Sequence, residues 1–306
     1  MFDLSPRPRQ VGVACLVYQF VCVSSYCAAA DDVATTLRER GLVVTEKDCQ
    51  ILELRVTEDT LTENDYRLIG QCTTLKKLTL SGKSLNSQTI PLLSGLRALE
   101  ELSTNGSQLT DDDYRHFAAL KNLRSLALWH PSWGLESFTG AGLIHLKALS
   151  NLERLTFAGS TAGDAALEAI GQIAQLHELS TWHSRQTQAG NAFLTNLPAL
   201  ERLRIGQRLP EWNTDTAPSF DGPTIAVLAK IKSLQSLELF EARLSAADLA
   251  PLAKLPNLHT LKIHTVDISP ADIEQFAATA PHLKVDFKPL TDEEEQGTLT
   301  KKLRLP

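Results

Sequence analysis

The sequence predicts an α/β solenoid of stacked repeats, a horseshoe with a parallel sheet on its inner face and short helices on its convex face. A pattern of the form apolar-x-x-apolar-x-apolar occurs nine times in the 306 residues, with Thr in place of the last apolar residue in two copies. Most of its copies lie 24 residues apart, and a second apolar pair follows most of them. A fixed period in this range is typical of solenoids, in which each repeat contacts only its neighbours.

Each repeat opens with a short strand, because its apolar residues alternate with variable ones. The nine repeats begin at Ile51, Leu75, Leu99, Leu123, Leu152, Leu176, Leu200, Leu234 and Leu258. The apolar pair that follows is spaced by three, as in Leu93 and Leu96, which is typical of a helix that turns one apolar stripe inward. One coil therefore consists of a strand, a turn, a helix and a return.

The predicted helix starts share a hydroxyl residue that is followed three positions later by aspartate. The four pairs are Thr62 and Asp65, Thr110 and Asp113, Ser245 and Asp248, and Ser269 and Asp272. This spacing is similar to a capping box with Asp in place of Glu. We therefore expect helices to begin at these four places.

The repeats resemble those of the leucine-rich repeat family, in the form common among exported bacterial proteins. Residues 99–122 carry the resemblance best, with Leu99-Glu-Glu-Leu102, then Leu109-Thr110-Asp111, then Phe117 and Leu120. The resemblance covers about residues 51–287 and implies the horseshoe fold. It implies no single activity, because members bind proteins, peptides or glycans or serve as scaffolds. Many members place Asn at the ninth position, where this chain has Lys83, Ser107 and Ser160, so we expect different turn bonding.

The chain divides into four expected parts: a secretory signal peptide at 1–30, an N-terminal cap at 31–50, the leucine-rich repeat domain at 51–288, and a mobile charged tail at 289–306. Arg7 and Arg9 precede an apolar run over 11–23, and three alanines end at residue 30, which is the layout of a signal peptide. The alternative is a short membrane anchor, but a span needs roughly 20 apolar residues. We expect an exported protein that is periplasmic, in the cell envelope or extracellular, with no membrane span after removal of the signal.

Charge and cysteine content narrow the classes of partner. The net charge is −6 and no block of Lys and Arg occurs, which argues against nucleic acid and anionic membranes. Cys49 and Cys72 lie 23 residues apart, on adjacent coils, and an exported protein could oxidise them to a disulfide. Alternatively, Cys72 fills the core, because equivalent positions hold Leu or Ile. No zinc site is expected from two cysteines without a matching histidine.

The middle repeats break the pattern. The repeat from Leu123 runs 29 residues and that from Leu200 runs 34, and the additions contain Trp133 and Trp212. Local departures from a regular pattern are typical of functional sites. The competing interpretation is drift, because loops tolerate insertions.

Two of the four tryptophans occupy the same repeat position. Trp129 and Trp182 fall on the seventh position, just past the strand, and each is followed by a histidine, His130 or His183. The repeat between them has Ala and Gly at 158–159. We expect two Trp-His walls about 10 Å apart over a small-residue notch on the concave face. The competing interpretation is that these rings pack as structural cover.

The sequence thus predicts a non-enzymatic binding module without cofactor or metal, because no catalytic motif is present and the two histidines lack a third ligand at suitable spacing. The expected partner is a protein or peptide. Glycan binding and a structural cell-envelope scaffold are the alternatives. The predicted ligand-binding residues are Trp129, His130, Trp133, Arg154, Trp182, His183, Arg204, Trp212, Glu238 and Phe240.

Overall fold

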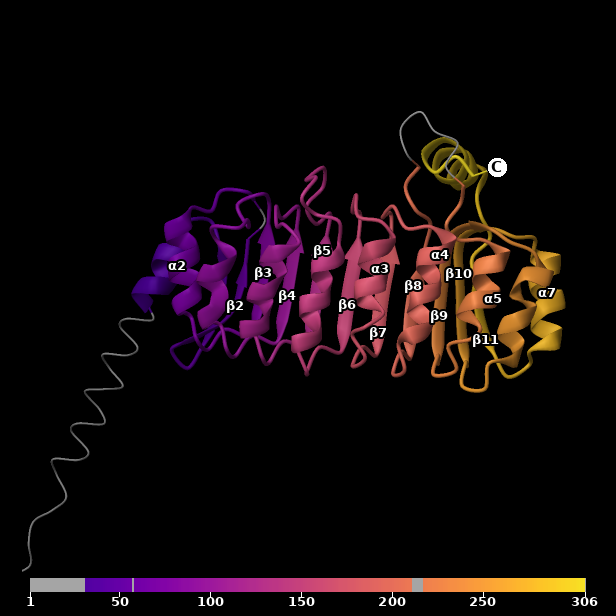
Figure 1. The fold of residues 1–306 in the computed structure, drawn as a ribbon, viewed down its shortest axis with the longest axis horizontal. Helices are drawn as coiled ribbons and strands as arrows, with labels where there is room; N and C mark the ends of the chain where they lie inside the picture. Colours follow the sequence, from indigo (N-terminus) through magenta and orange to yellow (C-terminus); the bar gives the residue numbers. More distant parts are fainter. Residues whose placement is uncertain (1–30, 57, 211–216, 306) are drawn as a thin grey trace, which may run out of the picture.

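The computed structural model describes residues 31–56, 58–210 and 217–305. These residues form a sheet of eleven strands whose order in space follows the chain (Figure 1). β1 pairs antiparallel with β2, and every later pair is parallel. The strands are β1 (Val43–Lys47), β2 (Gln50–Arg55), β3 (Lys77–Ser81), β4 (Glu101–Asn105), β5 (Ser125–Trp129), β6 (Arg154–Ala158), β7 (Glu178–Trp182), β8 (Arg202–Ile205), β9 (Ser236–Arg243), β10 (Thr260–Asp267) and β11 (Lys284–Phe287).

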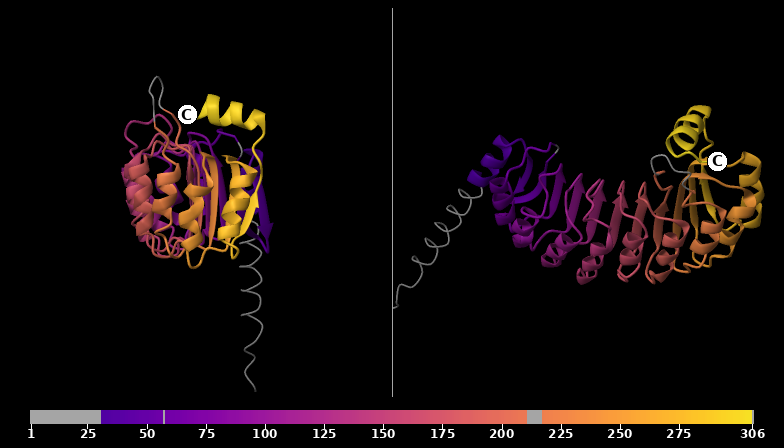
Figure 2. Two further views of the ribbon diagram at one scale, coloured as in Figure 1. Left: turned by 90° about the vertical axis from the view of Figure 1, so that its right-hand side faces the viewer. Right: turned by 45° about the horizontal axis from the view of Figure 1, so that its top comes forward.

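Short helices cover the outer side of the sheet, and Figure 2 shows that the whole forms an arc with the helices on its convex side. The α-helices on this side are α2 (Glu63–Gln71), α3 (Asp164–Ile170), α4 (Gln188–Asn191), α5 (Gly222–Leu228), α6 (Ala246–Leu249) and α7 (Pro270–Thr279). The 3₁₀ helices are Ile90–Gly95, Asp112–Ala119, Ala141–Ala148, Ala192–Asn196 and Ala250–Lys254. A helix over residues 31–39 precedes β1 and caps the N-terminal end.

One leucine from each repeat strand lies in register with the next, so the core runs the length of the arc. The aligned residues are Leu54, Leu78, Leu102, Leu126, Leu155, Leu179, Leu203, Leu237 and Leu261. Each of them is buried. Stacking of one such leucine per coil buries a continuous apolar core that no single repeat could bury alone. The predicted leucine-rich repeat solenoid, with its parallel inner sheet and outer helices, is confirmed.

The predicted helix starts are confirmed at three of four places. Thr62 and Ser245 make reciprocal capping boxes, and the Ser269 hydroxyl accepts from the Asp272 N–H. At Thr110 the outcome differs, because a 3₁₀ helix begins at residue 112 and its N-cap is Asp111 without a side-chain cap bond. The carboxylate of Asp111 instead bonds to the next coil.

Aspartate carboxylates join adjacent coils at several places, of which Asp59 and Asp111 are two. Asp111 accepts backbone N–H bonds from Gly140 and Gly142, each at 3.0 Å. Asp59 accepts from the backbone N–H groups of Lys83 and Ser84 at 2.8 and 3.0 Å. A carboxylate that accepts several N–H bonds satisfies loop donors that would otherwise lack partners. Asp59 stands at the ninth position of its repeat, where the sequence predicts different turn bonding, whereas Asp111 lies at the thirteenth position of its own.

The C-terminal tail is folded, so the prediction of a mobile tail at 289–306 is wrong over its described residues. Helix α8 (Asp292–Glu294) continues into a π-helix over Glu295–Lys302, drawn in yellow above β9 and β10 in Figure 1. Leu299, Leu303 and Leu305 form a buried cluster with Leu209 and Leu290. The charged residues face solvent, and the leucines between them supply the apolar contact that orders the segment.

Cys72 is a free cysteine, so it is not bonded to Cys49. Its side chain is buried in the core and its Sγ lies 3.5 Å from the Leu68 carbonyl oxygen. The Cys49–Cys72 bridge is therefore corrected: Cys72 occupies a core position that other repeats fill with Leu or Ile, and its thiol points inward.

Candidate binding site on the concave face

Trp129 and Trp182 stand at the ends of two strands that are separated by a third. The ladder aligns Trp129 with Ala158 and Ala158 with Trp182. Their strand neighbours two residues earlier share their face, because side chains alternate along a strand. The indole rings meet edge to face, with centroids 5.4 Å apart and planes at 69°. Both rings therefore project on one side of the solenoid, the concave side, as predicted.

The expected open notch between the two rings is absent. Ala158 beneath them is only 2% exposed. A Cβ built on Gly159 would lie 2.5 Å from Cδ2 of His130, so the imidazole covers that glycine. Parallel strands are about 4.8 Å apart, which is less than the width of an indole ring. Each ring therefore leans over the small residue beside it, and the two predicted walls close into one surface.

The same alternation continues to Phe240, which covers the glycine at the next small position. A Cβ on Gly206 would lie 2.6 Å from the Phe240 ring. The Phe240 and Trp182 rings meet edge to face at 5.3 Å and 75°. Trp129, Trp182 and Phe240, with the small residues Ala158 and Gly206 between them, thus form a continuous line of rings that we call the aromatic ridge.

Arg204 extends from β8 into the aromatic ridge. Its guanidinium carbon lies 4.6 Å from the Trp182 ring centroid and 4.7 Å from that of Phe240. Its Nε lies 3.0 Å from Oε1 of Glu238 on the neighbouring strand. Two ring faces and one carboxylate fix the orientation of the guanidinium, while 43% of the side chain stays exposed. The arginine is held in place and still accessible to a ligand.

The side chains of His130 and His183 interact with two different residues. His130 Nδ1 lies 2.9 Å from Oδ1 of Asn105. His183 Nε2 lies 3.0 Å and 2.8 Å from the two carboxylate oxygens of Glu241, whose side chain is nearly buried. Among the described residues, no group of three or more His, Cys, Asp and Glu is placed to hold a metal ion. Each imidazole is therefore held beside the aromatic ridge by a partner of its own, Asn105 for His130 and Glu241 for His183.

Both histidines share a left-handed backbone with Glu241. The φ angles are 45° at His130, 51° at His183 and 59° at Glu241. Other coils place Gly82, Gly106 and Gly159 at this eighth position, also with positive φ. A non-glycine residue in this region costs energy and is concentrated at functional sites. Thr265 at the eighth position of the repeat from Leu258 also has a positive φ, 53°, so the left-handed backbone belongs to the repeat turn, and the glycines of the other coils are the sequence signal for it.

Of the remaining predicted contacts, Arg154 and Trp133 lie apart from the aromatic ridge. Arg154 aligns with Ser125 and Glu178 at the other end of its strand, and its closest ion-pair partner is Glu153 at 4.0 Å. Trp133 is 49% exposed on the first insertion. Trp212 lies outside the described residues. The structure thus gathers Trp129, Trp182, Arg204, Glu238 and Phe240, with both histidines beside them.

The first insertion holds Trp133 on an ordered turn. Ser132 is buried, its hydroxyl bonds to the carbonyl and N–H of Leu109, and its backbone N–H donates to the Ser107 carbonyl at 2.7 Å. Beyond Trp133, the insertion borders a hollow of about 440 Å³, of which Leu135 and Phe138 form part of the lining. The insertion leaves the upper edge of the sheet in Figure 1, the edge at which the strands end.

The buried side-chain amide of Gln207 joins the two described ends of the second insertion. The Gln207 side-chain oxygen accepts from the backbone N–H groups of Arg208, Ser219 and Phe220. Its Nε2 donates to the Phe220 carbonyl at 3.0 Å. Both ends of the insertion are therefore fixed to the eighth position of the repeat, directly beside Gly206 of the aromatic ridge.

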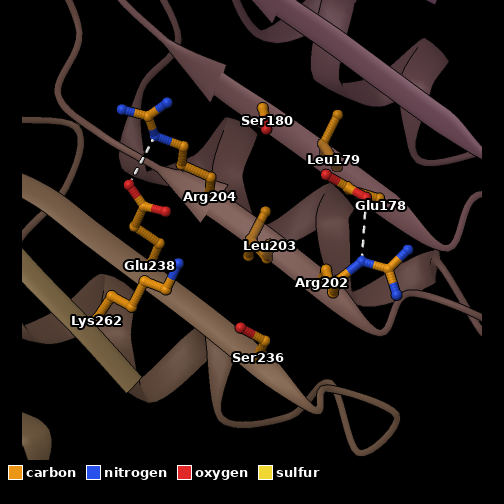
Figure 3. A pocket seen from close by; sticks show the side chains of 9 residues that line it. All are labelled: Glu178, Leu179, Ser180, Arg202, Leu203, Arg204, Ser236, Glu238 and Lys262. Carbon is orange, nitrogen blue, oxygen red and sulfur yellow. Dashed lines mark hydrogen bonds and ion pairs between the residues drawn. The ribbon is translucent and has the colours of Figure 1, made fainter. Parts of the chain in front are cut away.

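A polar hollow of about 280 Å³ opens on the concave face next to the aromatic ridge (Figure 3). It is lined by Glu178, Leu179, Ser180, Arg202, Leu203, Arg204, Ser236, Glu238 and Lys262. Arg204 belongs to both features. Of these residues, only Arg204 and Glu238 are predicted as contacts from the sequence. The repeat positions of the other lining residues also bring them together, because all of them occupy the third to fifth positions of four successive repeats.

Comparisons with known proteins bear on the fold alone. No family model matches the chain, and no curated protein matches it. A solved structure, the crystal structure of a TLR13–ssRNA13 complex, is similar with 17% identity and a TM-score of 0.47, and covers 78% of this chain. The match covers 32% of the TLR13 chain, so this chain spans about a third of that length. The leucine-rich repeat class of the fold follows from the aligned coils themselves.

Proposed function

We propose that this chain is an exported, non-enzymatic binding module that recognises a protein or peptide on the concave middle of its solenoid. The observation that carries the proposal is the aromatic ridge with Arg204 held against it. Rings and guanidinium groups dominate the binding energy of protein interfaces, particularly when they are positioned before the partner arrives. Here Trp129 and Trp182 are half-buried against one another and keep their remaining surface toward solvent.

The ring geometry favours a peptide over a glycan. A sugar ring stacks best on an exposed ring face that lies parallel to it. Here Arg204 covers one face of Trp182 and one face of Phe240, and neighbouring rings meet by their edges. Such a surface offers a corrugated apolar line with a cation in it, which suits alternating side chains of an extended peptide. Glycan binding and a purely structural role in the cell envelope are the alternatives to peptide binding.

The non-enzymatic and exported parts of the proposal rest on the sequence. Catalytic motifs are missing, and the N-terminal 30 residues have the layout of a signal peptide of the kind that exported bacterial leucine-rich repeat proteins carry. In the described part of the chain, none of the helices has the length and apolarity that a membrane crossing requires. Mass spectrometry of protein recovered from an exporting host tests the first part, since the proposal requires a mature N-terminus at Asp31.

Selection from a displayed random-peptide library tests peptide recognition. The immobilised chain is the bait, and the double variant Trp129→Ala/Trp182→Ala is the counter-selection bait. The proposal expects peptides that bind the wild type and lose affinity by about 30-fold or more on the double variant, since hot-spot residues carry 2 kcal/mol or more. A glycan array probed in parallel measures the alternative. Retention of glycans with no enriched peptide would reverse the assignment.

A further inference from the structure

The polar hollow contains a lysine that no ion pair neutralises within the described residues. Its lining carries three cations, Arg202, Arg204 and Lys262, and two carboxylates, Glu178 and Glu238. Glu178 pairs with Arg202 at 3.0 Å, and Glu238 pairs with Arg204 at 3.0 Å; Arg202 has a second partner in Glu201, at 3.6 Å, which lies outside the lining. Lys262 forms no ion pair within the described part of the chain. Lys262 is therefore the lining cation that stays unpaired within the described residues, on a concave surface where its charge acts at close range on a ligand.

Hydrogen-bond donors in the hollow are also unused. Arg204 binds Glu238 through Nε, and its two terminal nitrogens bond to no described residue. The hydroxyls of Ser180 and Ser236 have no hydrogen-bond partner among the described residues either. Figure 3 places Arg204 and Lys262 on one side of the hollow and Arg202 on the other. A planar guanidinium with two free N–H-bearing nitrogens matches the two oxygens of a carboxylate.

We propose that the polar hollow binds a carboxylate side chain of the peptide that lies on the aromatic ridge. This inference rests on the proposed function and specifies its ligand. Arg204 is shared by both features, so the acidic and the apolar side chains of the ligand lie close together. Lys262 supplies the charge that balances the carboxylate, and Ser180 and Ser236 supply the remaining donors.

Two features favour a carboxylate over a phosphate. Only one lining cation, Lys262, is unpaired within the described residues, which matches a monoanion, whereas a phosphate monoester carries about −1.5 to −2 at neutral pH. Glu178 and Glu238 in the same hollow would repel the second charge. The single negative charge of a bound carboxylate is therefore balanced by the lining of the hollow.

The geometry also limits the sequence spacing in the ligand. Arg204 and Gly206 are two residues apart on one coil, which corresponds to roughly 7 Å along a strand. An extended peptide covers this distance with two residues. The ligand should therefore carry Asp or Glu about two positions from a large apolar residue that contacts the Trp182–Phe240 part of the aromatic ridge.

The test uses a synthetic array of end-blocked peptides with one tryptophan and, one to four positions away, Glu, Gln or phosphoserine. It is probed with the purified chain and with Trp182→Ala, Arg204→Ala, Arg204→Lys and Lys262→Ala. Lys284→Ala on β11 is the matched control, because Lys284 is exposed on the neighbouring strand and does not line the hollow. Lys262→Ala keeps the experiment decisive even if Arg204→Ala perturbs the rings.

We expect Glu peptides to bind about ten-fold tighter than Gln peptides, with the optimum at two positions, since a charge-assisted hydrogen bond contributes ~1.5 kcal/mol or more. Arg204→Ala should abolish this preference, Lys262→Ala and Arg204→Lys should reduce it, and Lys284→Ala should leave it unchanged. Equal binding of Glu and Gln peptides that still depends on Trp182 would refute the carboxylate site and leave peptide recognition standing. A preference for phosphoserine would also refute it. Absence of binding to any peptide would overturn both proposals.

Discussion

The indole of Trp182 meets the indole of Trp129 edge to face at 5.4 Å, although a complete strand, β6, lies between the two residues. The contact is possible because Ala158 on that strand is too small to separate the rings. Bulky and small residues therefore alternate from coil to coil along the seventh repeat position. A surface assembled in this way spans several repeats, so its parts are expected to respond together to substitution.

Replacement of the two tryptophans should reveal this coupling. We expect Trp129→Ala and Trp182→Ala each to lower the free energy of unfolding modestly, because the rings are half-buried and outside the leucine core. The two effects should be non-additive by about 1 kcal/mol, the value typical of an edge-to-face pair. Urea denaturation of the wild type, both single variants and the double variant measures the coupling. Additive losses would mean that the rings do not support one another.

Gly206→Ala should disturb the aromatic ridge without unfolding the protein. The added Cβ would lie 2.6 Å from the Phe240 ring, so the ring has to move away from Arg204. We expect a several-fold loss of peptide affinity with little change in melting temperature. Gly163→Ala is the control, because its Cβ meets its nearest neighbour at an ordinary 3.5 Å. Equal peptide affinity in the two variants would show that the Phe240 position does not matter for binding.

Gln186→Leu should stabilise the solenoid. Gln186 is fully buried at the eleventh repeat position, and neither polar atom of its amide has a hydrogen-bond partner among the described residues. Regular repeats hold Leu there, as at Leu85. We expect the free energy of unfolding to rise by about 1–3 kcal/mol, the usual cost of an unsatisfied buried polar group. The reciprocal change, Leu85→Gln, should destabilise the chain, and a stability loss on Gln186→Leu would contradict this account of the site.

The C-terminal tail should behave as a docked unit with its own small core. Leu299 is fully buried in a cluster that is separate from the main core, and Arg243 joins the tail at 3.3 Å from Glu295 and 3.2 Å from Thr300. Leu299→Ala should therefore release the tail locally, with faster tryptic cleavage at Lys301 and an unchanged global melting temperature. Gly297→Ala, which meets open space, is the control. Rapid cleavage of the wild-type tail would restore the prediction of mobility.

The buried thiol of Cys72 should make stability sensitive to alkaline pH. Burial raises the pKa of Cys72 from 9.0 to about 11. The unfolded chain therefore loses this proton first, and the stability present below pH 9 declines as the pH rises toward 11. We expect the urea midpoint of the wild type to fall more steeply over this window than that of Cys72→Ala. Parallel curves for the two proteins would exclude a contribution from this thiol.

Repeat phase allowed the sequence to predict the solenoid, its register and the common face of Trp129 and Trp182. The period of the leucines carries this information, because each strand must bury the same positions. The contact between the rings was not predictable from phase, since it depends on the width of an indole relative to the strand spacing. The open notch was expected because Ala158 was interpreted as empty space rather than as space that a neighbour fills.

Other differences also have physical reasons. The tail was expected to be mobile because its charges are conspicuous, while Leu299 and Leu303, four residues apart, already indicated an apolar helix face. The Cys49–Cys72 disulfide was considered from sequence separation, which does not give the direction of a side chain. Lys262 was not predicted as a contact, because a single lysine on a strand becomes part of a site only when the neighbouring coils place Arg204 and Glu238 beside it.

The central claim is that the aromatic ridge is the recognition surface, and calorimetric titration tests it most directly. One peptide selected on the wild type is titrated into the wild type, Trp182→Ala and the exposed control Lys284→Ala. We predict that Trp182→Ala weakens binding by about 30-fold or more, as expected for a central hot spot, while Lys284→Ala binds like the wild type. Equal affinity of Trp182→Ala and the wild type for the selected peptide would contradict the account and place recognition elsewhere on the solenoid.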